Sequence, residues 1–477
     1  MCTTCLLMAG CGEDEVAPAD ASTPDALGAD ADATADAAGD PCEPNPCLND
    51  GICDGDGAEV SCECPDGYAG SHCAIAVKPL AAGGFHSCAV IDTGDVRCWG
   101  NNTSGELGYG HTDSVGDEET PYMADDLVEL GGRVAQLTAG NAHTCALLES
   151  GEVYCWGGNS DGRLGYGHTQ NIGDNESVAS AGAVDVGGSV VQISAGSQHT
   201  CALLNEGNVR CWGDGEWGAL GYGNTDNVGD DKTPAEAGDV DVGGRVIQVA
   251  AGGTHTCALL ESGGVKCWGF NVRGQLGYPE LSDDIGADLP PSDAEEVDVG
   301  GTVVEIATGH SFTNWSHTCA RMASGSVRCW GYNASGQLGY GHDDDIGDDE
   351  TPADAGDVPL GGTALRLGLG HGHTCAVLEG GALRCWGSGQ HGKLGYGSVE
   401  NVGIEDTPAD AGDVDVGGSV RWVTAGSSHT CAGLKGDLLA VRCWGQGDVG
   451  ALGYGNTDNI GDSEDNLPRH AGNVPLQ

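Results

Sequence analysis

Paired cysteines are the most regular chemistry-bearing feature of the sequence. In one typical stretch, Cys145 and Cys155 flank Glu149-Ser150-Gly151, which suits a three-residue hairpin loop with the glycine in the left-handed conformation. That hairpin pairs Leu148 with Glu152 and so sets the two cysteines opposite each other, at the separation that a disulfide requires. We predict such cross-strand disulfides at Cys88–Cys98, Cys145–Cys155, Cys201–Cys211, Cys257–Cys267, Cys319–Cys329, Cys375–Cys385 and Cys431–Cys443, the last across a longer loop.

A histidine stands two residues before the first cysteine of every pair. Imidazoles arranged around a common axis could bind a metal ion or respond to pH. A functional site usually breaks repeat symmetry, however, whereas a packing role recurs in every copy. We therefore favour a structural hydrogen bond that holds the preceding Ala-Gly turn. The seven residues are His86, His143, His199, His255, His317, His373 and His429.

Acidic loops follow Gly-Tyr-Gly segments that recur along the sequence. Carboxylates and backbone carbonyls at this density are the oxygen ligands that calcium prefers. Their order differs from that of an EF-hand loop, and residues 401–405 hold a single acidic side chain, so we favour a solvated turn over a calcium site. The candidate calcium ligands are Asp113, Asp117, Asp226, Asp230, Asp344, Asp348, Asp458 and Asp462. No other metal or cofactor is expected.

Motifs of catalysis do not accompany these residues. The sequence contains no H-E-x-x-H zinc motif and no phosphate-binding glycine loop of the P-loop type. A sialidase-like propeller would need clustered arginines for its substrate's carboxylate, yet basic residues such as Arg97, Arg210 and Arg328 recur at similar repeat positions. We therefore expect no enzyme activity.

Composition excludes several classes of partner. Lys and Arg number 18 against 72 Asp and Glu, a formal net charge of −54, and so negative a surface repels nucleic acids and anionic lipids. The 85 glycines among 477 residues favour a turn-rich, all-β chain, and the 23 cysteines indicate an oxidising compartment. No apolar run reaches the roughly 18 residues of a membrane-spanning helix. We expect no nucleic-acid partner.

The first 40 residues are typical of an anchor followed by a tether. Leu6-Leu7-Met8-Ala9-Gly10-Cys11-Gly12 resembles the lipobox of bacterial lipoproteins, which implies that Cys11 is lipidated. The first basic residue is Lys78, so we interpret residues 1–12 as a signal remnant and expect the true start upstream; the alternative is a disordered start with stray cysteines. Residues 13–40 hold nine acidic residues and no basic or aromatic one, which predicts a disordered, solvated linker.

Six cysteines lie between residues 41 and 74, at positions 42, 47, 53, 62, 64 and 73. So short a stretch builds no core of its own, and disulfides must hold it. Spacing alone does not choose the connectivity. The pattern, with Gly67-Tyr68-Ala69-Gly70 before the last cysteine, resembles an EGF-like domain. The resemblance implies Cys42–Cys53, Cys47–Cys62 and Cys64–Cys73; a plain disulfide knot is the alternative.

Residues 75–477 are seven copies of one repeat, whose first cysteines lie 56, 57 or 62 residues apart. Short β-prone runs between glycine turns predict small antiparallel sheets. The unit A-G-x-x-H-[ST]-C-A-L…G-x-V-x-C-W-G…G-x-L-G-Y-G resembles the regulator-of-chromosome-condensation (BNR-like) repeat, which implies an all-β, seven-bladed β-propeller with four-stranded antiparallel blades. In that family both chain ends close the ring, so Asn473-Val474-Pro475-Leu476 is expected to complete the first blade, near Lys78-Pro79-Leu80.

These features predict a non-enzymatic binding or display protein outside the cytoplasm, either secreted or held at the cell surface or outer membrane by its lipid anchor. We expect a monomer that docks an unidentified protein on its loops. The repeat also resembles secreted propellers that inhibit β-lactamase, so inhibition of an extracellular enzyme is the alternative. A calcium-dependent adhesin and a guanine-nucleotide exchange factor are less favoured. Docking residues should break repeat symmetry, as Trp217, Trp315 and Trp422 do.

Overall fold

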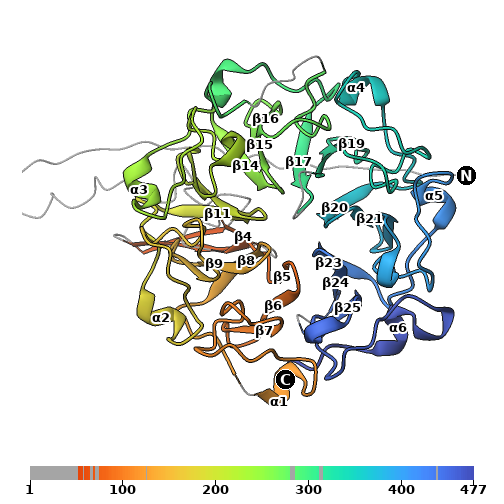
Figure 1. The fold of residues 1–477 in the computed structure, drawn as a ribbon, viewed down its shortest axis with the longest axis horizontal. Coiled ribbons are helices and arrows are strands. Elements are labelled where there is room, and N and C mark those ends of the chain that lie inside the picture. The colour runs from red at the N-terminus through yellow and green to blue at the C-terminus, as the bar shows by residue number, and fades with distance from the viewer. Residues whose placement is uncertain are drawn as a thin grey trace, which may run out of the picture.

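Seven small β-sheets are arranged in a ring around a central axis in the computed structural model (Figure 1). The structure describes residues 52–56, 59–64, 68–69, 75–124, 126–279, 285–310, 315–436 and 439–477. Each sheet has three antiparallel strands that follow one another along the chain, so each repeat builds one blade. The all-β, seven-bladed expectation is therefore met.

Every blade has an inner, a middle and an outer strand, named here in that order. They are β5 (Leu80–Ala82), β6 (His86–Val90) and β7 (Val96–Gly100) in blade 1; β8 (Val134–Ala139), β9 (His143–Leu148) and β10 (Val153–Gly157) in blade 2; β11 (Val190–Ala195), β12 (His199–Leu204) and β13 (Val209–Gly213) in blade 3; β14 (Val246–Ala251), β15 (His255–Leu260) and β16 (Val265–Gly269) in blade 4; β17 (Val303–Thr308), β18 (His317–Met322) and β19 (Val327–Gly331) in blade 5; β20 (Ala364–Leu369), β21 (His373–Leu378) and β22 (Leu383–Gly387) in blade 6; and β23 (Val420–Ala425), β24 (His429–Leu434) and β25 (Val441–Gly445) in blade 7.

Single helical turns lie around the rim of the ring (Figure 1). Thr233 caps one of them by accepting a hydrogen bond from the backbone N–H of Glu236, whose carboxylate accepts one from the N–H of Thr233 in return. The turns are α1 (Pro121–Ala124), α2 (Val178–Ala181), α3 (Pro234–Ala237), α4 (Pro352–Ala355), α5 (Pro408–Ala411), α6 (Pro468–Ala471), η1 (Glu216–Gly218), η2 (Pro291–Asp293), η3 (Gln390–Gly392), η4 (Asp448–Gly450) and η5 (Glu464–Asn466). Within the described ranges, none of the helices could span a bilayer.

The blades are three-stranded, which corrects the four-stranded expectation. A fourth segment does reach the outer strand, but it makes a single pairing: Val240 N donates to Val209 O at 2.8 Å. In blade 2 the equivalent residue, Val184, is followed at once by a tight turn in which Val186 N donates to Val184 O at 2.9 Å. This turn directs the chain away from the sheet before a second pair can form.

The C-terminal segment completes blade 7, not blade 1, so that prediction was wrong. Val474 N donates to Val441 O at 2.8 Å, because the fourth segment of each blade is supplied by the chain that follows it. The next carbonyl, Pro475 O, accepts from Tyr122 N of blade 1 at 3.1 Å. Ala235 N makes the same contact with Asp185 O between blades 2 and 3, at 3.1 Å. The ring therefore closes through an ordinary contact between neighbouring blades.

Disulfides join the middle and outer strands of all seven blades. Leu148 N donates to Glu152 O, so Cys145 faces Cys155 in the expected register, with Cα atoms 4.1 Å apart. The bonds are Cys88–Cys98, Cys145–Cys155, Cys201–Cys211, Cys257–Cys267, Cys319–Cys329, Cys375–Cys385 and Cys431–Cys443. Their sulfurs are fully buried in the core.

The region before the propeller is described only in part. Two short hairpins are present: β1 (Ile52–Asp56) pairs with β2 (Glu59–Glu63), and β3 (Tyr68–Ala69) pairs with β4 (Ile75–Ala76). Cys62 and Cys64 each take part in a disulfide bond. Each pairing implied by the EGF-like resemblance, Cys42–Cys53, Cys47–Cys62 and Cys64–Cys73, includes a side chain outside the described residues, as does the lipidation expected at Cys11.

Replacing both cysteines of one blade with alanine, as in Cys145→Ala/Cys155→Ala, is expected to lower the free energy of unfolding. The loop that the bond closes is short, so lost chain entropy accounts for about 2–3 kcal/mol. The cavity left in a fully buried site adds to this loss. Chemical denaturation monitored by tryptophan fluorescence measures the change. An unchanged unfolding midpoint would contradict a stabilising role for the bond.

Candidate functional site

The ring has two faces, which we name by what lies on them. The inner strands begin on the linker face, where the chain leaving β4 crosses blade 2 and the Gln136 side-chain amide donates to Ala76 O at 2.8 Å. The outer strands end on the opposite, loop face, where each Cys-Trp-Gly sequence is followed by a loop. A central channel lies between the inner strands and is lined by residues of all seven blades.

The seven histidines link each blade to the next. Each Nε2 lies within 3.0 Å of a hydroxyl oxygen in the neighbouring blade, and a histidine of blade 7 closes the circle onto blade 1. The pairs are His86–Thr144, His143–Thr200, His199–Thr256, His255–Thr318, His317–Thr374, His373–Thr430 and His429–Ser87. These bonds run around the ring, so the imidazoles do not converge on a shared ligand.

Hydrogen-bond direction fixes the protonation of each imidazole. The Thr144 hydroxyl donates its one hydrogen to Glu106 O at 3.1 Å, so it must accept from His86 Nε2. The ring is therefore the neutral Nε2–H tautomer, and burial lowers the pKa of His86 to about 3. The Trp156 indole N–H donates to the same Glu106 carbonyl at 2.9 Å. The loop after blade 1 and two side chains of blade 2 thus meet at the carbonyl oxygen of Glu106.

The structural role expected for the histidines is present, and the imidazole adds a second contact to it. The backbone carbonyl of His86 accepts from Gly83 N at 2.8 Å, which holds the preceding Ala-Gly turn, while the imidazole packs against that glycine and bonds the hydroxyl of the next blade. A Cβ on Gly83 would lie 2.4 Å from His86 Cε1 and 2.6 Å from Gly140 O, so glycine is required there. Short-range reasoning identified the contact with the turn but could not identify a hydroxyl 58 residues away.

A glutamine ladder joins the inner strands of blades 2 to 5. Gln136 Nε2 donates to Val191 O at 3.2 Å, and its Oε1 accepts from Ile193 N at 3.1 Å, so the side chain substitutes for a backbone partner. Gln192 and Gln248 repeat the arrangement. Around the ring, this position is occupied by Pro79, Gln136, Gln192, Gln248, Glu305, Arg366 and Trp422. The symmetry therefore breaks at blades 5 to 7 and at blade 1.

On the loop face, aromatic side chains break the symmetry at blades 3 to 5. Trp217 meets Phe270 with ring centroids 5.1 Å apart, and Tyr332 stacks on Trp315 at 5.3 Å. Arg273, three residues after Phe270 in the chain, lies over the Tyr332 ring at 5.5 Å. Trp315 is 47% exposed. We call Trp217, Phe270, Val272, Arg273, Tyr332 and Trp315 the aromatic arc.

Sequence reasoning found part of this surface. Trp217 and Trp315 lie in the arc, whereas Trp422 is buried in the inner strand of blade 7, beneath the guanidinium of Arg421 at 4.1 Å. Phe270 and Tyr332 were missed. They occupy the position directly after Cys-Trp-Gly, where the other blades have the small or polar residues Asn101, Gly158, Asp214, Ser388 and Gln446, and comparing the seven copies there would have exposed them.

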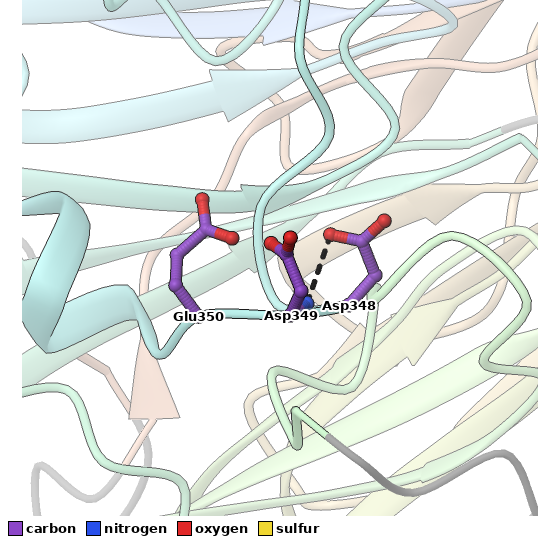
Figure 2. A group of neighbouring side chains, drawn as sticks. All are labelled: Asp348, Asp349 and Glu350. Carbon is purple, nitrogen blue, oxygen red and sulfur yellow. Dashed lines mark hydrogen bonds between the residues drawn. The ribbon is translucent and has the colours of Figure 1, made fainter.

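The acidic loops lie on the same side as the loop face. In Figure 2 the carboxylates of Asp348, Asp349 and Glu350 lie close together, with oxygen atoms within 4.8 Å of one another. Burial, together with the neighbouring aspartates, raises the pKa of Glu350 to about 7. Asp348 is the one calcium candidate in this cluster. Asp113, Asp226, Asp344 and Asp458 are exposed, and Asp117, Asp230 and Asp462 are half-buried.

The candidate aspartates also have partners of their own. Asp117 Oδ1 accepts from Glu118 N at 3.0 Å, and Asp462 Oδ1 accepts from the Asn466 amide at 2.8 Å. Such local bonds suit the solvated turns that we favour. The solvated turn stays a prediction, and calcium binding stays its alternative.

Comparison with known proteins agrees with this architecture. The family model described as "RCC1-like domain" matches residues 51–432. The chain belongs to the RCC1-like domain family. It is 30% identical over 381 residues to the ultraviolet-B receptor UVR8 of Arabidopsis thaliana, which covers 79% of each chain. It is also 30% identical over 385 residues to the human E3 ubiquitin-protein ligase HERC2, 80% of this chain but 7% of that protein's length.

Solved RCC1-like structures share the fold. Human WBSCR16 superposes with a TM-score of 0.58 at 23% identity, covering 75% of this chain and 86% of that one. Yeast RCC1 (Prp20), in its complex with Kap60, gives 0.56 at 21% identity, covering 73% and 77%. These likenesses establish the fold alone.

The seven histidine–hydroxyl pairs form what we call the histidine circle. Removing one hydroxyl of this circle should destabilise the propeller. Thr144→Val keeps the side-chain shape but leaves His86 Nε2–H without an acceptor, at a cost of about 1–3 kcal/mol. Thr144→Ser is the matched control, because Ser87 fills this position in blade 1 and bonds His429 at 2.8 Å. Denaturant unfolding compares the two variants. Equal losses from valine and serine would show that the hydroxyl contributes nothing.

Stability should fall as the pH drops from 6.5 to 5. Burial lowers the pKa of four histidines to about 3: His86, His199, His255 and His317. Between pH 6.5 and 5 these imidazoles therefore stay neutral in the folded protein, whereas they gain protons in the unfolded chain. Each such histidine lowers the free energy of unfolding by about 1.4 kcal/mol for each pH unit below its pKa in the unfolded chain. The raised pKa of Glu350, about 7, acts in the opposite sense and offsets part of this loss. Urea titrations at half-unit intervals give the slope, and a flat profile would contradict buried neutral imidazoles.

Proposed function

We propose that this chain is an extracytoplasmic, non-enzymatic binding protein that holds a protein partner on its loop face. The aromatic arc is the observation that carries the proposal. In the proposal, an EGF-like module over residues 41–74 and the acidic linker over residues 13–40 connect the propeller to a lipid anchor at Cys11. The seven buried disulfides support an oxidising compartment.

The arc has the composition of an energetic centre in protein interfaces. Trp, Tyr and Arg dominate such centres because they bury large areas while losing little side-chain freedom. Arg273 and Tyr332 already hold each other in place, and Trp217 is fixed by Phe270 and by a turn with a positive φ of 61°. Val272, 68% exposed, extends the apolar area between them. A rigid surface of this kind pays little entropy on binding.

The geometry of the chain leaves this face accessible. The segment before the propeller joins at the linker face, where Ala76 O meets Gln136. The arc lies on the opposite face, at the ends of the outer strands of blades 3 to 5. An anchor at the N-terminal side would therefore direct the arc away from the surface that carries the anchor.

Inhibition of an extracellular enzyme is the second candidate. Trp315 favours it, because this exposed residue belongs to an insertion that lengthens blade 5 relative to the other repeats. A projecting aromatic side chain beside Tyr332 suits insertion into a partner's cleft. Nucleotide exchange on a cytoplasmic GTPase fits less well with seven disulfides, although a bovine secretion-regulating guanine nucleotide exchange factor is 30% identical over 342 residues.

Variants of the arc test the proposal. Protein carrying Trp217→Ala and Tyr332→Ala should lose, by tenfold or more, the partner that the intact chain captures from native cell surfaces. With the purified partner, each substitution should cost about 1–4 kcal/mol of binding free energy. Val399→Ala is the matched control, since Val399 is 51% exposed but lies outside the arc. Full retention of the partner by the arc variants would refute the proposal.

A further inference from the structure

At the linker face, the basic residues Lys78 and Arg366 line the central channel, and Arg421 precedes the lining residue Trp422 in the chain. Lys78 precedes β5 in blade 1, Arg366 lies on β20 in blade 6, and Arg421 lies on β23 in blade 7. Lys78 itself lies against the inner strand of blade 2, where its N–H donates to Ala135 O at 2.9 Å. In a chain with a formal charge of −54, such a cluster needs a reason.

None of the three has an ion-pair partner among the described residues, whereas other arginines do. Arg210, Arg328 and Arg384, on the outer strands, each pair with an aspartate at 2.8–2.9 Å. Lys78 and Arg366 line the cavity, and neither forms an ion pair with a described carboxylate, whereas Arg421 stacks on Trp422 outside the lining. Arg97 and Arg442, at the same outer-strand position as the three paired arginines, also lack a carboxylate partner, but they contact Tyr122 and Asn473 instead.

Glu305, the carboxylate that lines this part of the channel, is already engaged. Its Oε2 accepts from Arg321 Nε at 2.7 Å and its Oε1 accepts from Leu367 N at 3.2 Å. The surrounding protein lowers the pKa of the Lys78 ammonium by displacing solvent; Glu305 offsets part of this effect, and the charge of Arg366 adds to it. Lys78 and Arg366 thus repel each other, and positive charge exceeds negative charge at the mouth.

The size and polarity of the channel cavity restrict the class of ligand that it can bind. The channel cavity has a volume of about 180 Å³, below the roughly 300 Å³ at which pockets for drug-sized ligands begin. Apolar residues, among them Ile193, Val249 and Leu367, line part of it. A guanidinium matches a carboxylate through two parallel hydrogen bonds, and an ammonium adds a point charge. The partner chemistry is therefore anionic, compact and partly apolar.

We propose that the linker-face mouth of the channel binds a small organic acid with two carboxylates, which Arg366 and Lys78 anchor. One carboxylate takes the fork of Arg366, and the other lies against Lys78 and relieves the repulsion between the two cations. The aliphatic body of the acid rests against Leu367, which lines the cavity on the same strand as Arg366. This site lies on the face opposite the aromatic arc, so it is independent of the proposed docking of a protein.

Ligand-dependent stability tests the site. Succinate and glutarate, added to the full chain at low ionic strength, should raise the melting temperature saturably, and calorimetry should detect one site per chain. Arg366→Gln and Lys78→Gln should each weaken binding at least tenfold. Arg245→Gln is the matched control: Arg245 is an exposed cation on the same face, paired with Glu261 and outside the channel lining.

Two further measurements keep the result unambiguous. Without ligand, Arg366→Gln should be at least as stable as the parent chain because it removes a repulsion, so lost binding cannot be attributed to misfolding. Acetate and phosphate are the comparison anions. No saturable effect of the dicarboxylates, an undiminished effect in Arg366→Gln, or an equal effect of phosphate would each overturn the assignment.

Discussion

The propeller depends on a hydrogen-bonded junction that is repeated between neighbouring blades. A neutral histidine donates to a hydroxyl of the next blade, and that hydroxyl donates to a backbone carbonyl; at blades 1 and 2, the Glu106 carbonyl also accepts from the Trp156 indole. All of these groups are buried, so losing any one of them strands another without a partner. Disulfides stabilise each blade internally, but this junction holds the blades in a ring.

Local spacing explains what the sequence could reveal about the fold. The Cys145–Cys155 pair follows from a three-residue turn, because a hairpin register is set within about a dozen residues. The partner of His86 lies 58 residues away in another blade, and no local pattern identifies it. The assignment of Val474 to blade 7 failed for a related reason: the segment repeats Val358, but its neighbours in space decide which blade it completes.

The same limit applies to the candidate site. Trp217 and Trp315 are outliers in composition and were identified as such, whereas Phe270 and Tyr332 become visible only when the seven loops are compared position by position. Their contacts use a geometry that is also present between blades 1 and 2: the residue after Cys-Trp-Gly approaches a residue four positions after the Gly of the preceding blade. Gly158 lies beside Ser104 in this way, with a built Cβ 3.5 Å from the serine Cβ. The arc places aromatic and cationic groups at this existing junction.

Symmetry therefore separates scaffold from function. The histidine circle, the disulfides and the tryptophans of the seven Cys-Trp-Gly sequences recur in every blade, because each blade must pack against its two neighbours to close the ring. Two groups of positions that do not recur lie on opposite faces: large aromatic side chains at blades 3 to 5, and the channel-lining cations Lys78 and Arg366. Aromatic area suits a protein surface, and two neighbouring cations in a narrow channel suit a compact anion. Because rigid blades separate the two groups, selection can change one without disturbing the other.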